Sequence, residues 1–213
     1  MTTSLTKTHQ EAIKRAGATQ TLSKLKQAQL QRNRHTTAGI PCVVGDISGS
    51  MHGTKIGELR RCYDSIWRAN IRCLVFESET YELEAQSDIG TLTARGGTQM
   101  LEALEEAWNT PNLTQIVLMS DGQPDRGPEA ILEAAKHHLD TPIDTVGIGD
   151  QGKLDFNPEF LQELARLTGG RYYDCSEPIH LTATVQALLD SPPKGKISEG
   201  SGSEDSSSRV IQL

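Results

Sequence analysis

Residues 43–51 of this 213-residue chain read VVGDISGSM, and this stretch indicates both the fold class and the location of a candidate site. It overlaps the end of a short apolar run, residues 40–46, which is typical of a buried β-strand. It leads into a segment in which apolar side chains recur every three or four positions between Ile56 and Trp67, as in an amphipathic helix. A buried strand followed by such a helix is typical of an α/β protein.

The same alternation of strands and helices continues along the chain. Further strands are expected at residues 71–77, 79–84, 115–120, 143–148 and 171–174. Further helices are expected at residues 100–108, 131–139 with Pro128 near the start, 158–167 between Asn157 and the pair Gly169–Gly170, and 178–189. The tight turn between the strands at 71–77 and 79–84 predicts that these two are antiparallel neighbours. We therefore expect a doubly wound, Rossmann-like α/β fold with a mostly parallel six-stranded sheet, one antiparallel edge strand and helices on both faces.

Charge divides the chain into a basic arm and an acidic body. The formal net charge is −7, of which residues 1–36 carry +6 and the remainder −13. Because nucleic-acid binding depends on a basic surface, this balance argues against a dedicated nucleic-acid binder. Residues 1–37 have the spacing of one or two amphipathic helices, which would pack on the body or fray in solvent. Alternatively, this arm contacts a membrane surface, nucleic acid or a protein partner.

The other end of the chain has a composition typical of disorder. Residues 191–213 are rich in Ser, Gly and acidic side chains, and residues 191–209 contain too little apolar surface to offset the entropy cost of ordering. The apolar residues 210–213 could add as a strand to a partner's sheet or have no function. The folded domain is therefore expected to span residues 38–190.

The sequence also predicts a cytoplasmic protein. It has no run of about 18 apolar residues that would span a bilayer, and its first residues lack the apolar core of a secretory signal. Its four cysteines are widely spaced and form no C-x-x-C pair, which is typical of buried core thiols in a reducing compartment: Cys42, Cys62, Cys73 and Cys175.

Oxygen-bearing side chains follow two of the predicted strands and precede one of the predicted helices. Asp46, Ser48 and Ser50 alternate after the first strand, and Asp121 follows the strand at 115–120. Thr98 precedes the helix that begins near Gln99, where it is also a candidate N-cap. Since loops converge at the carboxyl edge of an open α/β sheet, two carboxylates and three hydroxyls can meet there. Oxygen ligands without Cys or His select a hard divalent cation, with Mg²⁺ favoured and Mn²⁺ and Ca²⁺ as alternatives.

These motifs resemble the metal-ion-dependent adhesion site of von Willebrand factor A domains, in the form of an intracellular stand-alone domain. The D-x-S-x-S, G-G-T and S-D-G motifs occur in the family's order, and the resemblance covers residues 38–190. It implies that Ser48 and Ser50 ligate the metal directly and that Asp46 binds through water. Thr98 would ligate directly in the ligand-bound form, and Asp121 directly or through water.

The resemblance further implies that a partner's Asp or Glu fills the vacant metal position. Two residues are candidates for the partner-binding rim: His52 and Asp125. The implied role is that of a protein-interaction adaptor, often beside an AAA+ ATPase or a kinase and phosphatase system. The alternative for the motif is that its Asp and Ser residues only form turns and caps.

No enzyme class fits the motifs. A haloacid-dehalogenase-type phosphatase needs a second carboxylate two residues after its first, and this chain has Ser48 there. The chain also lacks the P-loop motif and the serine-hydrolase elbow. We therefore expect a non-enzymatic, metal-dependent interaction module. The alternative is a structural component that assembles through its arm and tail, with the metal only stabilising the fold.

Overall fold

The computed structural model describes residues 39–68, 70–149, 156–175 and 177–191. Its contacts divide the chain into Met1–Gly39 and Ile40–Leu213, and the helices and strands described below all belong to the second unit. The predicted N-terminal arm and nearly all of the predicted C-terminal tail lie outside the described residues.

The strands form one sheet in which the order along the chain is not the order in space. The six strands are β1 (Ile40–Asp46), β2 (Arg72–Phe76), β3 (Thr80–Glu82), β4 (Leu113–Ser120), β5 (Ile143–Gly147) and β6 (Tyr172–Asp174). Their order across the sheet is β3-β2-β1-β4-β5-β6. All neighbours are parallel except β2 and β3, which are antiparallel. The predicted sheet, including its single antiparallel edge strand, is confirmed.

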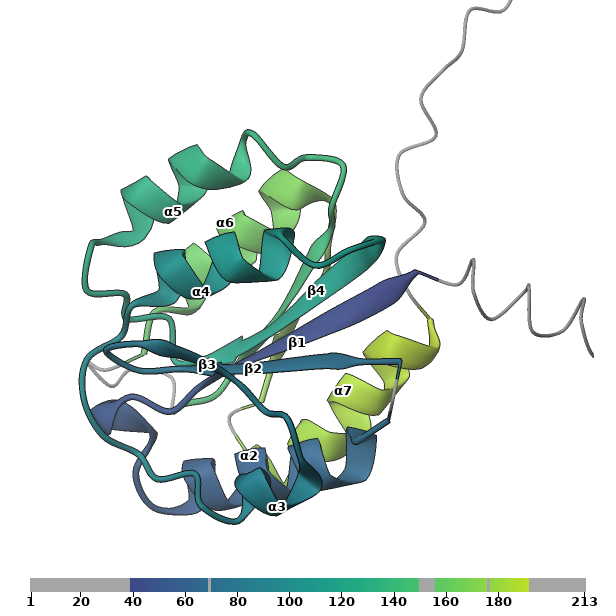
Figure 1. Cartoon of the computed structure of the whole chain (residues 1–213). Helices are drawn as coiled ribbons and strands as arrows, with labels where there is room; N and C mark the ends of the chain where they lie inside the picture. Colours follow the sequence, from purple (N-terminus) through teal and green to yellow (C-terminus); the bar gives the residue numbers. More distant parts are fainter. Residues whose placement is uncertain (1–38, 69, 150–155, 176, 192–213) are drawn as a thin grey trace, which may run out of the picture. The chain divides into compact units, whose positions relative to one another are not determined.

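Helices cover both faces of this sheet, as predicted. They are α2 (Thr54–Ile66), α3 (Gln86–Ile89), α4 (Met100–Trp108), α5 (Pro128–Ala135), α6 (Pro158–Thr168) and α7 (Leu181–Asp190), with single 3-10 turns η1 (Gly49–Met51) and η2 (Pro178–His180). One face carries α4, α5 and α6, and the other carries α2, α3 and α7 (Figure 1). No helix among the described residues has both the length and the apolar character needed to cross a bilayer.

Three details of the helix prediction were wrong. The helix expected to reach residue 139 ends at Ala135. Beyond it, the ring of His138 stacks on that of Trp108 with centroids 4.1 Å apart, and Leu139 is 41% exposed. The helix expected from residue 178 begins as the turn η2, and α7 starts only at Leu181. The short helix α3 was not expected, since four residues are too few to show a helical period.

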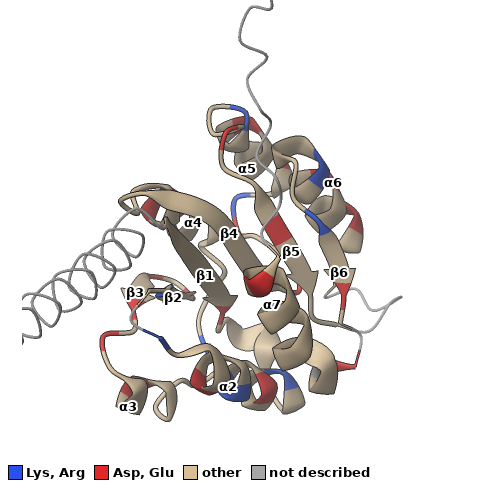
Figure 2. Ribbon diagram, turned by 90° about the vertical axis from the view of Figure 1, so that its right-hand side faces the viewer, with Lys and Arg blue, Asp and Glu red and all other residues tan. Residues whose placement is uncertain are grey.

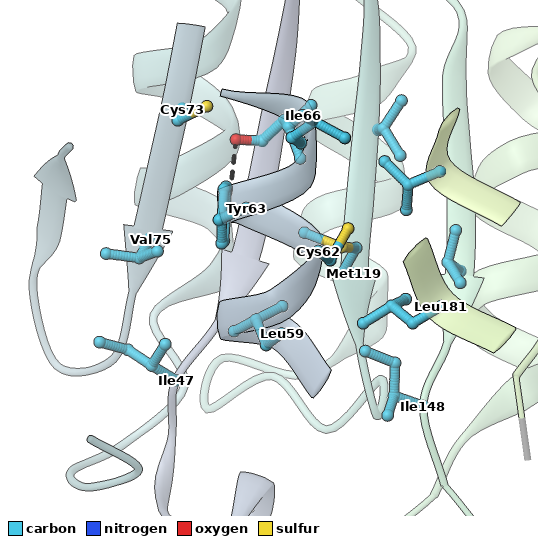
Figure 3. Packing of buried hydrophobic residues seen from close by; sticks show 14 of the residues in the cluster. Ile47, Leu59, Cys62, Tyr63, Ile66, Cys73, Val75, Met119, Ile148 and Leu181 are labelled. Atoms are coloured by element: carbon cyan, nitrogen blue, oxygen red, sulfur yellow. Dashed lines mark hydrogen bonds between the residues drawn. The ribbon is translucent and has the colours of Figure 1, made fainter. Parts of the chain in front are cut away.

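The core lies in two layers, one on each face of the sheet. Val43 and Met119 pack toward α2 and α7, whereas Val44 and Leu118 pack toward α4 and α6, because successive side chains of a strand point to opposite faces. Figure 3 shows Cys62 of α2 against Met119 of β4. All four cysteines are buried and free, as expected of core thiols.

The strand order locates the candidate site. From β1 the chain passes first to β2 on one side and later to β4 on the other, and the helices that follow β1 and β4, α2 and α5, lie on opposite faces of the sheet (Figure 1). This is the switch point at which open α/β sheets bind ligands. The register pairs Gly45 with Met119, which brings Asp46 and Ser120 side by side at the carboxyl edge of the sheet.

Candidate metal centre

Asp46 is the last residue of β1 and is fully buried. One carboxylate oxygen, Oδ1, accepts a hydrogen bond from the Ser48 backbone N–H at 2.8 Å. The other, Oδ2, accepts a hydrogen bond from the Ser120 hydroxyl at 2.7 Å. Burial and, second, the negative charge of Asp121 raise the pKa of Asp46 to about 7. The carboxylate is therefore held rigidly between two loops, in surroundings that penalise its charge.

A second buried carboxylate lies close to the first. Asp121 directly follows β4, its side chain is fully buried, and its charge acts on Asp46 strongly enough to raise that residue's pKa. Its Oδ2 lies 3.7 Å from the ammonium of Lys55. Two buried carboxylates near each other repel, and a divalent cation held by these residues would offset that repulsion.

The two serine hydroxyls of the first loop lie next to each other. The Oγ atoms of Ser48 and Ser50 are 3.1 Å apart. Ser48 is buried, and Ser50 lies in η1, whose 3-10 turn directs the chain from β1 toward α2. The tight alternation of the motif therefore brings the two hydroxyls together in one loop, and the Ser48 hydroxyl also bonds the Asp46 carboxylate.

Backbone hydrogen bonds connect the Thr98 loop to the first loop. The N–H of Gly49 donates to the carbonyl of Gly96 at 3.2 Å, and the N–H of Arg95 donates to the carbonyl of Ile47 at 2.9 Å. Gly96 has φ +69°, and a Cβ atom there would lie 1.9 Å from a Glu77 carboxylate oxygen, so this position requires glycine.

Thr98 itself is joined to the third loop. Its N–H donates to Asp125 Oδ2 at 2.8 Å, and the N–H of Asp125 donates back to the Thr98 carbonyl at 3.0 Å. The prediction that Thr98 caps α4 was wrong. The N-cap residue is Gln99, which makes no side-chain capping bond, because the reciprocal bonds to Asp125 hold Thr98 one residue before the helix boundary.

The five predicted ligands therefore lie on three loops that are connected by hydrogen bonds. Their oxygen donors are two carboxylates and three hydroxyls, a set that suits a hard cation such as Mg²⁺. The described part of the chain contains no group of three or more His, Cys, Asp and Glu residues arranged to bind a metal, so it offers no competing site of the zinc type. The residues present fit a magnesium ion.

The two predicted rim residues lie at different places. His52 is exposed directly after η1, and its Nδ1 contacts the carbonyl of Gly49. Asp125 is exposed and uses one carboxylate oxygen to bind the Thr98 backbone. Their contact with a partner stays a prediction.

Three further residues that support the site were not identified from the sequence. Ser120 orients Asp46, Glu77 lies against the Thr98 loop and bonds Arg95 at 2.8 Å, and Lys55 lies beside Asp121. Ser120 adjoins the recognised Asp121, which was the one available signal. The roles of Glu77 and Lys55 depend on contacts between distant segments.

Comparison with known proteins finds similarity to von Willebrand factor A domains in both sequence and fold. Residues 76–174 match the sequence model of the von Willebrand factor type A domain family. This matched range includes Thr98 and Asp121 and begins after the D-x-S-x-S motif. The match covers just under half of the chain and supports the resemblance to a von Willebrand factor A domain.

Two human proteins are similar in sequence. The chain is 32% identical over 103 residues to von Willebrand factor A domain-containing protein 3B, a match covering 45% of this chain and 8% of that protein. It is 28% identical over 183 residues to von Willebrand factor A domain-containing protein 3A, covering 74% of this chain and 15% of that protein. The chain therefore spans a small part of these relatives.

Solved structures share the fold. A von Willebrand factor type A protein from Catenulispora acidiphila superposes with a TM-score of 0.60 at 20% identity, covering 70% of this chain and 41% of that one. The SpRpn10 VWA domain superposes with a TM-score of 0.53 at 14% identity, covering 75% of this chain and 99% of that one. At these identities the likeness concerns the fold alone.

Proposed function

We propose that this domain is a metal-dependent protein-interaction module that binds a carboxylate of a partner through a Mg²⁺ ion. The observation that carries the proposal is the set of three connected loops around two buried carboxylates. Asp46, Ser48, Ser50, Thr98 and Asp121 would hold the ion, with Mn²⁺ or Ca²⁺ as substitutes.

The charge of this ligand set favours an outside acidic group. Two carboxylates and three neutral hydroxyls leave a hard cation with coordination positions for water or for an added ligand. A bound Mg²⁺ would supply a strong local positive charge at this edge of the sheet. A partner's Asp or Glu is the protein group that matches it best.

We propose no catalytic activity for the domain. Both carboxylates of the centre serve as metal ligands in this proposal, so neither is left to act as a general base on a metal-bound water. An adaptor role in the cytoplasm, beside an AAA+ ATPase or a kinase and phosphatase system, is the context that the family resemblance favours.

Isothermal titration with Mg²⁺ tests the metal site directly. We expect the wild-type protein to bind one ion, and Ser48→Ala to lose at least about tenfold in affinity because a direct ligand is removed. Ser87→Ala provides the matched control, since Ser87 is exposed on α3 and bonds only its neighbour Asp88 among the hydrogen bonds observed. Absence of Mg²⁺ binding by the wild type would contradict the proposal.

The partner contact needs a second experiment. Wild-type and Asp121→Ala proteins are used to capture binding partners from native lysate, with Mg²⁺ or with EDTA, and the retained proteins are identified by mass spectrometry. We expect a partner that is retained only by the wild type in Mg²⁺. Retention of the same proteins in all four samples would indicate an assembly component that binds through another surface.

A further inference from the structure

Lys55 lies beside the candidate metal centre at the start of α2. Its ammonium is 3.7 Å from Asp121 Oδ2 and donates a hydrogen bond to the Ser50 carbonyl at 3.2 Å. Its side chain is only 17% exposed, and the Asp121 side chain is fully buried. The Lys55 ammonium thus lies next to the carboxylate of one proposed ligand, Asp121, and bonds the backbone carbonyl of another, Ser50.

This ion pair differs from the other ion pair described on the helix. Helix α2 carries both positive and negative side chains (Figure 2). Arg61 pairs with Glu58 on the same helix, and its side chain is 70% exposed, so solvent screens that pair strongly. The pair between Lys55 and Asp121 is largely shielded from water and salt, so its electrostatic effect on the centre is greater.

We propose that Lys55 sets the charge of the metal centre: it competes with the divalent cation for Asp121 and, once the cation is bound, leaves an excess positive charge that favours an anionic ligand. Two carboxylates and a dication cancel in charge, and the ammonium adds one positive charge. This inference rests on the proposed metal-binding function. In it, Lys55 weakens the binding of the metal and makes the loaded centre more selective for a carboxylate.

The proposal predicts effects of opposite sign on the metal and on the acid. Lys55→Met removes the charge and keeps most of the apolar stem, so we expect Mn²⁺ to bind about fivefold to tenfold more tightly, because repulsion between two cations is removed. Free Mn²⁺ is measured by electron paramagnetic resonance on the full chain. Lys55→Arg keeps the charge and should leave the affinity near the wild-type value.

A control separates this local effect from a change in net charge. Lys136→Met removes the same charge at the far end of α5, where Lys136 pairs with Glu133. We expect its Mn²⁺ affinity to equal that of the wild type. Tighter binding by both methionine variants would show a general effect of net charge and would overturn the role of Lys55.

Acetate serves as the carboxylate probe in the second part of the experiment. Because binding of metal and acid are linked, acetate that prefers the loaded centre must strengthen Mn²⁺ binding. Acetate is added at about 50 mM, the concentration range that a weak carboxylate ligand requires. We expect it to increase the Mn²⁺ affinity of the wild type more than that of Lys55→Met. An equal effect in the two proteins would overturn the selectivity role.

The outcomes also distinguish the two proposals. Absence of Mn²⁺ binding in both the wild type and Lys55→Met would reject the metal-binding function and, with it, this inference. Binding in both proteins at equal affinity would support the metal site and reject the role of Lys55. Binding that appears only in Lys55→Met would support the competition between the ammonium and the metal, and it would contradict metal binding by the wild-type domain.

Discussion

At the scale of single residues, the position of one proposed metal ligand depends on a side chain outside the proposed ligand set. Thr98 makes no capping bond, and its backbone is held by the carboxylate of Asp125 at 2.8 Å and by the return bond from the Asp125 backbone at 3.0 Å. These bonds connect the Thr98 loop to the loop that carries Asp121. We therefore interpret Asp125 as a positioning residue for the proposed metal ligand.

Substitution of Asp125 tests this interpretation. Asp125→Ala removes the acceptor for the Thr98 N–H, and we expect Mn²⁺ affinity to fall about twofold to tenfold, because the loss of one such hydrogen bond costs about 1 kcal/mol. Asp125→Asn retains an oxygen acceptor and should keep most of the affinity. If the alanine and asparagine variants bind Mn²⁺ equally, the effect of Asp125 is not exerted through this hydrogen bond.

At the scale of secondary-structure elements, local signals determine where a helix begins and ends. Helix α6 starts after Asn157, whose side chain accepts a hydrogen bond from the Phe160 N–H at 3.1 Å. It ends at Gly169, which has φ +78° and is the left-handed residue that terminates many helices. Both signals lie within a few residues of the boundary, so the sequence alone predicted them.

Two glycines in helical regions should respond oppositely to alanine. Gly169→Ala forces a Cβ into a left-handed conformation, and we expect the free energy of unfolding to fall by about 1 kcal/mol. Gly57 lies inside α2, where an added Cβ would meet no atom within 4 Å. Gly57→Ala should therefore raise the free energy of unfolding by about 0.5 to 1 kcal/mol. Urea unfolding measures both changes, and effects of the same sign would contradict the assigned backbone conformations.

At the scale of the whole molecule, thiols in both core layers connect stability to pH. Burial raises the pKa of Cys42, Cys62 and Cys73 to about 12, from a usual value of 9.0. Cys42 lies in one core layer, and the other two lie in the second layer. Because these pKa values are raised in the folded state, the stabilising contribution is complete below pH 9.0 and is lost as the pH rises toward 12.

This linkage predicts unfolding at alkaline pH. Above pH 9 the free energy of unfolding should fall by about 1.4 kcal/mol per pH unit for each thiol, since the unfolded thiol ionises and the folded one does not. Urea unfolding at a series of pH values between 8 and 11, roughly bracketing the unfolded thiol pKa, measures the slope. Cys62→Ala should show a shallower fall than the wild type, and an unchanged slope would exclude a contribution from that thiol.

The succession of strands and helices along the chain and the candidate ligand motifs could be predicted from the sequence for a common reason. The burial of the central strands on both faces made them continuous apolar runs, as in β4, and the helices between them kept a period near 3.6. The motif from Asp46 to Ser50 is also local, because its two serine hydroxyls lie 3.1 Å apart within one loop. Short elements such as α3 gave no such period and were missed.

By itself, the sequence determined the α/β class and the parallel sheet with its antiparallel edge, and it indicated the residues that are proposed to hold a hard cation. Each of these depends on spacing within one segment of the chain. Only the tertiary structure decided how the site is supported: Ser120 bonds Asp46, Asp125 holds Thr98, and Lys55 lies beside Asp121. These partners come from different loops and helices, and a contact between distant segments leaves no periodic or local pattern in the sequence.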